Sequence, residues 1–300
     1  MFIKHLSSHL YILLATIIVA GSFLASGNVS GIISPFSLNL FRFTVAAIIL
    51  LPFILYVKRY RTKVLSTLPR AIVISFFYSI YFVCLFESLT MTTVLNTGTL
   101  FTVVPFVTAL ISFAVLREKI GFQKAVVYVT GALGTIWVVF QGNMDLLLSF
   151  NLNKGDLLFL LGAFSMCCYA VSMKTLFRND DMIVLVFSIL LGGMFWSFLI
   201  LLWKEQPLQW NLIEGTVAYN MMYLAIAATL ITTYLSQKAT VVLGPNKVIS
   251  YFYLNPALVA VLLFLIDDVK IETIILPGIL ISIFATVLLQ RNVKIKEVKV

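Results

Sequence analysis

The sequence predicts an all-α integral membrane protein with ten transmembrane helices in two inverted five-helix repeats. Three observations predict this fold: ten apolar segments of helical length, an uneven distribution of Lys and Arg between their connectors, and similar patterns in the two halves. Each segment has about 18 to 24 residues, which is enough for a helix to cross a hydrocarbon core of roughly 30 Å. A chain that is 61% hydrophobic and 11% charged also lies outside the usual composition of soluble globular domains.

The predicted helices follow one another in two series. In the first repeat, residues 1–150, we expect helices at 10–28, 34–57, 71–90, 94–116 and 122–140. In the second repeat, residues 151–300, we expect helices at 156–177, 182–203, 217–237, 246–266 and 273–290. The connectors are short, so neighbouring helices should pack antiparallel and no soluble domain is expected. Because five is odd, the second repeat enters the membrane from the opposite face, an arrangement typical of carriers.

The basic residues predict the orientation. With both termini in the cytoplasm, Lys154, Lys204 and Lys270 lie outside and Arg42 lies within a helix, which leaves 17 of the 21 Lys and Arg residues on the cytoplasmic side. Lys and Arg near helix ends are retained in the cytoplasm. The net charge of +9 therefore faces anionic lipid headgroups, so the bilayer, and not nucleic acid, is the expected partner.

Motifs for catalysis, metal binding or a cofactor are not found in the sequence. It has no His-Glu metal motif, no Gly-x-Ser-x-Gly elbow and no phosphate-binding glycine loop. Cys84, Cys167 and Cys168 all fall within predicted helices and are expected to be structural. The sequence thus predicts a protein that is not an enzyme and holds no metal or cofactor. The first helix is expected to be retained, because no cleavage motif follows it at the required place.

Two predicted helices share a proline and a polar first half. "NTGTLFTVVPFVTALISFAVLREKI" contains Pro105, and "NKVISYFYLNPALVAVLLFLIDDVKI" contains Pro256. A proline removes one backbone donor and crowds the carbonyl four residues before it, so the freed groups need water or neighbouring polar groups in a membrane. The polar turns in front offer candidates for a substrate cavity, which are Asn96, Thr99, Tyr251 and Asn255. Alternatively, the hydroxyls bond to their own helix and the prolines are packing kinks.

These two segments resemble the drug/metabolite transporter superfamily, in particular its EamA-type ten-helix members. The resemblance covers nearly the whole chain and includes the mid-helix proline, the aliphatic run and the exit Leu116-Arg117-Glu118. The second copy departs from the pattern with Asp267-Asp268, and the glycines of the fifth helix are shifted to Gly131 and Gly134. The resemblance implies transport of small metabolites by alternating access through a cavity between the two halves, commonly in a bacterial inner membrane. It implies no particular substrate.

Two ionisable residues lie within predicted helices. Arg42 and Glu87 stand on adjacent antiparallel helices near their outer ends, so they could come within reach of each other. A charge at a membrane helix centre costs about 2.5 to 3.5 kcal/mol, so a partner or water is expected. Glu87 could take up a proton or bind a cationic group, and Arg42 could meet an anionic substrate. Alternatively, the two form a structural ion pair or reach the outer surface.

Aromatic residues form the remaining candidates for the cavity. Helices expected to face the centre carry Tyr78, Tyr81, Trp137, Tyr169 and Tyr234. Aromatic walls with polar tips suit amphipathic solutes such as amino acids, amines or nucleobases. Aromatic residues also populate membrane interfaces, and that role explains most of the 25 phenylalanines.

Three function classes remain open. The favoured class is a secondary transporter that exports or exchanges a small-molecule substrate, without a nucleotide-binding motif for direct use of ATP. The second is a lipid-carrier flippase of the same fold, with Arg42 as the one deep basic candidate for a phosphate. The third is a non-transporting membrane partner or sensor. Proton or counter-solute coupling, and a monomer or a homodimer, are all compatible with the sequence.

Overall fold

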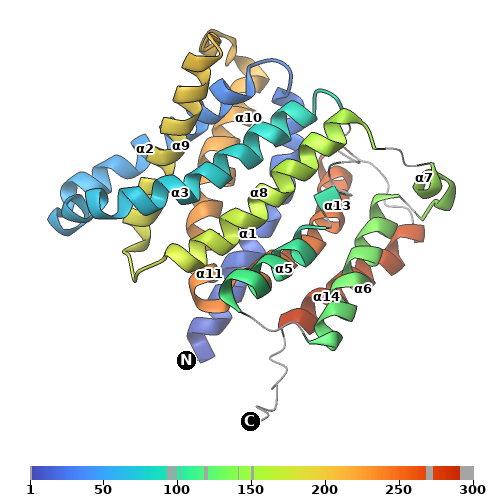
Figure 1. Ribbon diagram of the computed structural model, residues 1–300. Coiled ribbons are helices and arrows are strands. Elements are labelled where there is room, and N and C mark those ends of the chain that lie inside the picture. The colour runs from blue at the N-terminus through green and yellow to red at the C-terminus, as the bar shows by residue number, and fades with distance from the viewer. Residues whose placement is uncertain are drawn as a thin grey trace.

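The computed structural model describes residues 2–92, 97, 100, 101, 103–117, 121–140, 142–149, 152–267 and 273–290. These residues form a bundle of helices and contain no strand (Figure 1). The first half comprises α1 (Phe2–Val29), α2 (Pro35–Tyr56), α3 (Lys58–Ser88), α5 (Val104–Leu116) and α6 (Phe122–Val139). The short α7 (Met144–Leu148) leads into the second half.

The second half is more often interrupted. It comprises α8 (Lys154–Leu176), α9 (Met182–Trp203), the 3-10 turn η1 (Trp210–Leu212), α10 (Gly215–Ala225), the π-helical η2 (Ile226–Ile231), α11 (Thr232–Leu243), α12 (Pro245–Ser250), the 3-10 turn η3 (Tyr251–Leu254), α13 (Asn255–Asp267), the 3-10 turn η4 (Thr273–Ile275) and α14 (Leu276–Gln290). The break at η3 ends two residues before Pro256, as expected for a ring that removes a backbone donor.

Among the described residues, seven helical stretches are long and apolar enough to cross a membrane. They are Leu6–Val29, Pro35–Tyr56, Lys58–Ser88, Lys154–Leu176, Met182–Trp203, Gly215–Leu243 and Thr273–Gln290, and each overlaps a predicted helix. The other three predicted helices are also helical in their described parts. Residues 94–116 contain α5, residues 122–140 contain α6, and residues 246–266 are covered by α12, η3 and α13. The all-helical membrane fold is therefore confirmed, whereas the count of ten spans stays a prediction.

The third helix differs from its prediction. It was expected to begin near residue 71, but α3 begins at Lys58 and has 31 residues, a length of about 46 Å. This exceeds the roughly 30 Å of a hydrocarbon core, so one end of α3 extends beyond it. The extension is polar and basic, and its side chains bind two aspartates between α8 and α9, as described below.

Large apolar side chains cover the outside of the bundle. Leu133, Leu161, Phe198 and Leu280 are each more than half exposed. Such a surface is unfavourable in water, but it matches lipid tails. The outward-facing apolar residues thus agree with a multi-pass membrane protein.

The helices of the two halves pack against each other. α3 packs on α8 and α9, and α1 packs on α10, α11 and α13. α2 packs on α9, α5 packs on α8, and α6 lies beside α14 at one side of the bundle (Figure 1). α6 and α14 approach closely because glycines face each other: a Cβ on Gly278 would lie 2.6 Å from the carbonyl oxygen of Gly134.

Candidate functional site

A cavity of about 40 Å³ lies where the two halves meet. Its walls come from α1 and α3 in the first half and from α8, η2, α11 and η3 in the second half, with Phe101 of the segment before α5. Six aromatic side chains line it: Tyr78, Tyr81, Phe82, Phe101, Tyr169 and Phe252. Four hydroxyl side chains join them: Ser22, Thr232, Thr233 and Ser236. The lining is thus mostly apolar and rich in aromatic rings, with serine and threonine hydroxyls from α1 and α11.

Two stacked tyrosines form part of the cavity wall. The rings of Tyr78 and Tyr169 lie 4.6 Å apart at an angle of 21°. The Tyr78 hydroxyl is 2.9 Å from Thr233 Oγ1, and Gln237 Nε2 donates a hydrogen bond to the Tyr169 hydroxyl at 3.3 Å. These contacts join α3, α8 and α11, so both halves fix the position of the aromatic wall.

Arg42 lies beside this cavity and is completely buried. Its Nε and Nη2 atoms donate to Thr229 Oγ1 at 3.0 and 2.7 Å. Its guanidinium carbon lies 4.0 Å from the ring centre of Phe82, a cavity-lining residue. Thr229 in turn donates to the Leu224 carbonyl oxygen at 2.7 Å, five residues back, a spacing that suits the π-helical segment η2.

The anticipated pair between Arg42 and Glu87 is absent from the described part of the chain. Glu87 is exposed, and neither residue takes part in an ion pair there. Helix phase explains the difference: Phe82 and Phe86 of α3 face the guanidinium, at 4.0 and 5.5 Å, and the next residue, Glu87, points away.

Three other predicted aromatic residues lie outside the cavity lining. Trp137 stands on α6 and donates from Nε1 to the Ile274 carbonyl oxygen at 2.8 Å. The Tyr251 hydroxyl is 2.9 Å from His9 Nδ1, and the Tyr234 ring is 5.4 Å from the Lys238 ammonium. By contrast, Tyr78, Tyr81 and Tyr169 all line the cavity.

The two prolines stand in first turns of helices. Pro105 is in the first turn of α5, and Pro256 is the second residue of α13. Asn255 is buried, and neither atom of its amide has a hydrogen-bond partner among the described residues. None of these three residues lines the cavity. Asn96 and Thr99 lie outside the described residues.

Apart from Tyr234, the polar residues of the eighth predicted helix were not among the predicted site residues. Thr232, Thr233 and Ser236 line the cavity, and Gln237 binds Tyr169. They form two adjacent pairs four residues apart, so the pairs lie one turn apart along α11, and this polar stripe in an apolar segment was the signal that could have identified them.

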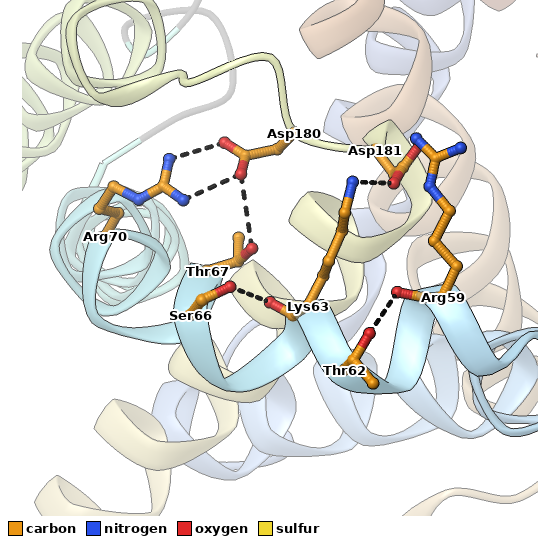
Figure 2. A network of polar contacts seen from close by, with 8 residues as sticks. All are labelled: Arg59, Thr62, Lys63, Ser66, Thr67, Arg70, Asp180 and Asp181. Carbon is orange, nitrogen blue, oxygen red and sulfur yellow. Dashed lines mark hydrogen bonds and ion pairs between the residues drawn. The ribbon is translucent and has the colours of Figure 1, made fainter.

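A second polar network ties the beginning of α3 to the loop between α8 and α9 (Figure 2). Arg70 donates to both carboxylate oxygens of Asp180, at 2.7 and 2.9 Å. Lys63 and Arg59 bind Asp181 at 2.8 and 3.1 Å. Burial alone would raise the pKa of Asp180, but hydrogen bonds from Arg70 and the Arg178 N–H, with the charge of Arg70, outweigh it and lower that pKa.

The comparisons with known proteins agree with this architecture. The model of the EamA-like transporter family matches residues 6–140 and 153–291, once in each half. A solved structure described only as "Crystal structure of protein" is similar with a TM-score of 0.67 and 18% identity, over 94% of each chain. At this identity the likeness shows the fold alone. No curated relative matches the chain. Because the family model covers most of both halves, the chain belongs to the EamA-like transporter family of the drug/metabolite transporter superfamily.

Proposed function

We propose that the protein is a secondary transporter that moves small organic solutes across a bacterial inner membrane by alternating access. The observation that carries this proposal is the cavity between the halves, whose lining includes the stacked pair of Tyr78 and Tyr169. Carriers built from inverted repeats place their substrate at the interface of the repeats.

The helix packing supports an inverted repeat. If the second half repeats the first, α8, α9, α10 with α11, α12 with α13, and α14 correspond to α1, α2, α3, α5 and α6. Such a repeat requires contacts to occur in equivalent pairs. The contact of α3 with α8 is matched by the contact of α11 with α1. The contact of α5 with α8 is matched by the contact of α13 with α1. Two helices also pack directly on their own counterparts in the other half: α2 on α9, and α6 on α14. The separate family matches in each half agree with this relation.

The lining of the cavity favours an amphipathic solute. Flat aromatic faces bind rings, apolar chains or cations, and the tyrosine and threonine hydroxyls hydrogen-bond to polar groups. Amino acids, amines and nucleobases combine these features. The volume of about 40 Å³ exceeds what one water needs but is far below the roughly 300 Å³ of small ligand sites, so helices must move apart to admit a solute.

The polar network at the beginning of α3 supports the orientation with both termini in the cytoplasm. Lys63, Arg59 and Arg70 gather at this end of the bundle, and basic residues near helix ends are retained inside. The same end holds Asp180 and Asp181, so the network joins the two halves on the proposed cytoplasmic side.

The proposal is tested by binding and flux together. Purified protein is screened against a metabolite library by thermal shift, because a ligand of the folded state raises apparent stability. A solute that binds is then tested for counterflow into proteoliposomes loaded with the same unlabelled solute. We expect counterflow with the wild type and none with Ser236→Trp, which fills the cavity.

Ser66→Trp is the matched control, since it makes the same change on the exposed side of α3. It should retain wild-type counterflow. Binding without counterflow in the wild type would contradict transport and favour a sensor. Counterflow that survives Ser236→Trp would place the pathway elsewhere.

A further inference from the structure

The guanidinium of Arg42 has more donors than the described residues supply acceptors. Its five N–H groups find a single acceptor among the described residues, Thr229 Oγ1, which receives bonds from both Nε and Nη2. Nη1 is buried and has no hydrogen-bond partner in the described part of the chain. No carboxylate there pairs with Arg42.

Asn39 repeats this pattern one helical turn away. It is completely buried, and neither its Oδ1 nor its Nδ2 atom is hydrogen-bonded to any described residue. Residues three apart on a helix are neighbours, so Asn39 and Arg42 project to the same side of α2. The two lie in the first third of the helix, with Arg42 about 10 Å from its beginning at Pro35.

Burying such groups without partners is unfavourable. A charge within a membrane helix is unfavourable unless it has a partner or water, and an unpaired buried amide adds to this cost. The contact of the guanidinium with the Phe82 ring compensates only in part. A site that retains an unneutralised cation next to an unpaired amide is suited to a ligand that brings a negative charge and hydrogen-bond acceptors.

We propose that Arg42 and Asn39 form a carboxylate subsite, which binds the negatively charged end of the solute. This inference rests on the proposed function, because it assigns the substrate class of the same site. The planar guanidinium presents Nη1 to a carboxylate as a charge-assisted donor, and the Asn39 amide supplies a second donor.

The subsite adjoins the aromatic cavity. Phe82 contacts Arg42 and lines the cavity, and Ala228, the neighbour of Thr229 in η2, lines the cavity as well. A solute with its carboxylate at Arg42 would therefore place its apolar body against Phe82 and the tyrosines. Since the guanidinium lies against the Phe82 ring, the Phe82 side chain must move for a solute in the cavity to reach Arg42.

The charges favour a carboxylate over a phosphate or a cation. Arg42 is the one completely buried basic residue in the described part of the chain, and every residue that lines the cavity is uncharged. One positive charge neutralises a monoanion, whereas a phosphate dianion would retain net charge in a low-dielectric site. A cationic solute would meet Arg42 with no carboxylate among the described cavity residues to offset the repulsion.

The test uses the full-length protein in detergent and four probes built on one ring: phenylacetate, phenylacetamide, benzylamine and phenylphosphonate. Affinities are taken from thermal shift at pH 8. We expect phenylacetate to bind about tenfold to a hundredfold more tightly than phenylacetamide, the effect of hydrogen bonds to a charged group. Arg42→Gln should abolish this preference while leaving phenylacetamide binding unchanged.

A second variant covers the case in which Arg42→Gln does not fold. Asn39→Ala removes one donor and keeps the charge, so it should weaken phenylacetate binding and leave phenylacetamide binding unchanged. Equal or tighter binding of phenylacetamide, benzylamine or phenylphosphonate by the wild type would overturn the subsite. So would a phenylacetate preference that survives Arg42→Gln, or no stabilisation by millimolar phenylacetate. Failure of the proposed function would look different, since a solute would then bind without counterflow.

Discussion

Replacing Asp180 with asparagine should weaken the junction between α3 and the loop before α9. The carboxylate accepts hydrogen bonds from Nη1 and Nη2 of Arg70, and Thr67 Oγ1 approaches it at 3.5 Å. Asparagine has nearly the same shape but has no negative charge and only one acceptor oxygen. The variant therefore removes the ion pair without creating a large cavity.

The burial of the pair sets the expected loss. The side chains of Arg70 and Asp180 are 17% and 10% exposed, so the pair is screened much less than a surface pair. Hydrogen bonds to charged groups contribute about 1.5 to 3 kcal/mol, and exposed ion pairs about 0 to 1 kcal/mol. We expect Asp180→Asn to lower the free energy of unfolding by about 2 kcal/mol.

Asp181 provides the matched control on the adjacent residue. Its partners Arg59 and Lys63 are 67% and 40% exposed, so Asp181→Asn should cost less than about 1 kcal/mol. Both variants are measured by equilibrium unfolding in mixed micelles, followed by circular dichroism. A double-mutant cycle with Arg70→Gln should give a coupling energy of about 1 to 2 kcal/mol. Equal losses at the two aspartates, or no coupling, would refute this reasoning.

Three further predictions concern packing, pH and topology. Gly278→Ala should lower the melting temperature and reduce the free energy of unfolding by about 1 to 3 kcal/mol, because its Cβ would lie 2.6 Å from a backbone oxygen of α6. Gly121→Ala is the control and should leave the melting temperature unchanged, because there is open space around Gly121. The folded state lowers the pKa of Asp180, so the carboxylate stabilises the fold above about pH 4, the pKa of the group in the unfolded chain. This stabilisation is lost as the pH falls further. The stability difference between wild type and Asp180→Asn should therefore disappear in strong acid. A difference that persists there would contradict the ion pair. Cysteines at Asn153 and Gln209 should react with an impermeant maleimide outside intact cells, and cysteines at Thr62 and Asn179 should not; the reverse pattern would exclude the proposed orientation.

Hydropathy predicted the helices that are apolar along their whole length. Residues 182–203 were predicted as a helix and form α9, and residues 34–57 closely match α2. The beginning of α3 escaped this method because it is polar and basic. Its side chains are satisfied by aspartates more than a hundred residues away, which no local sequence window includes.

The site was harder to predict than the fold. In helices that are apolar on all sides, the sequence does not indicate which face is turned inward. Tyr78 and Tyr169 line the cavity, whereas Trp137 turns toward η4, and only the packing of whole helices decides between these outcomes. The sequence likewise does not indicate which residue binds Arg42, because that depends on how the neighbouring helices are rotated. Thr229 reaches Arg42 from a π-helical segment, which has no sequence signature of its own.

The central claim is that one cavity between two inverted halves opens to each side of the membrane in turn. Ser236→Cys, introduced after replacement of Cys84, Cys167 and Cys168, places a thiol in the cavity lining. Labelling with a small impermeant thiol reagent is compared in right-side-out and inside-out vesicles, with Ser197→Cys as a buried control on α9.

We predict that Ser236→Cys is labelled from both faces, that a bound solute protects it, and that Ser197→Cys stays unlabelled. Labelling of Ser236→Cys from one face alone, or from neither, would contradict alternating access through this cavity.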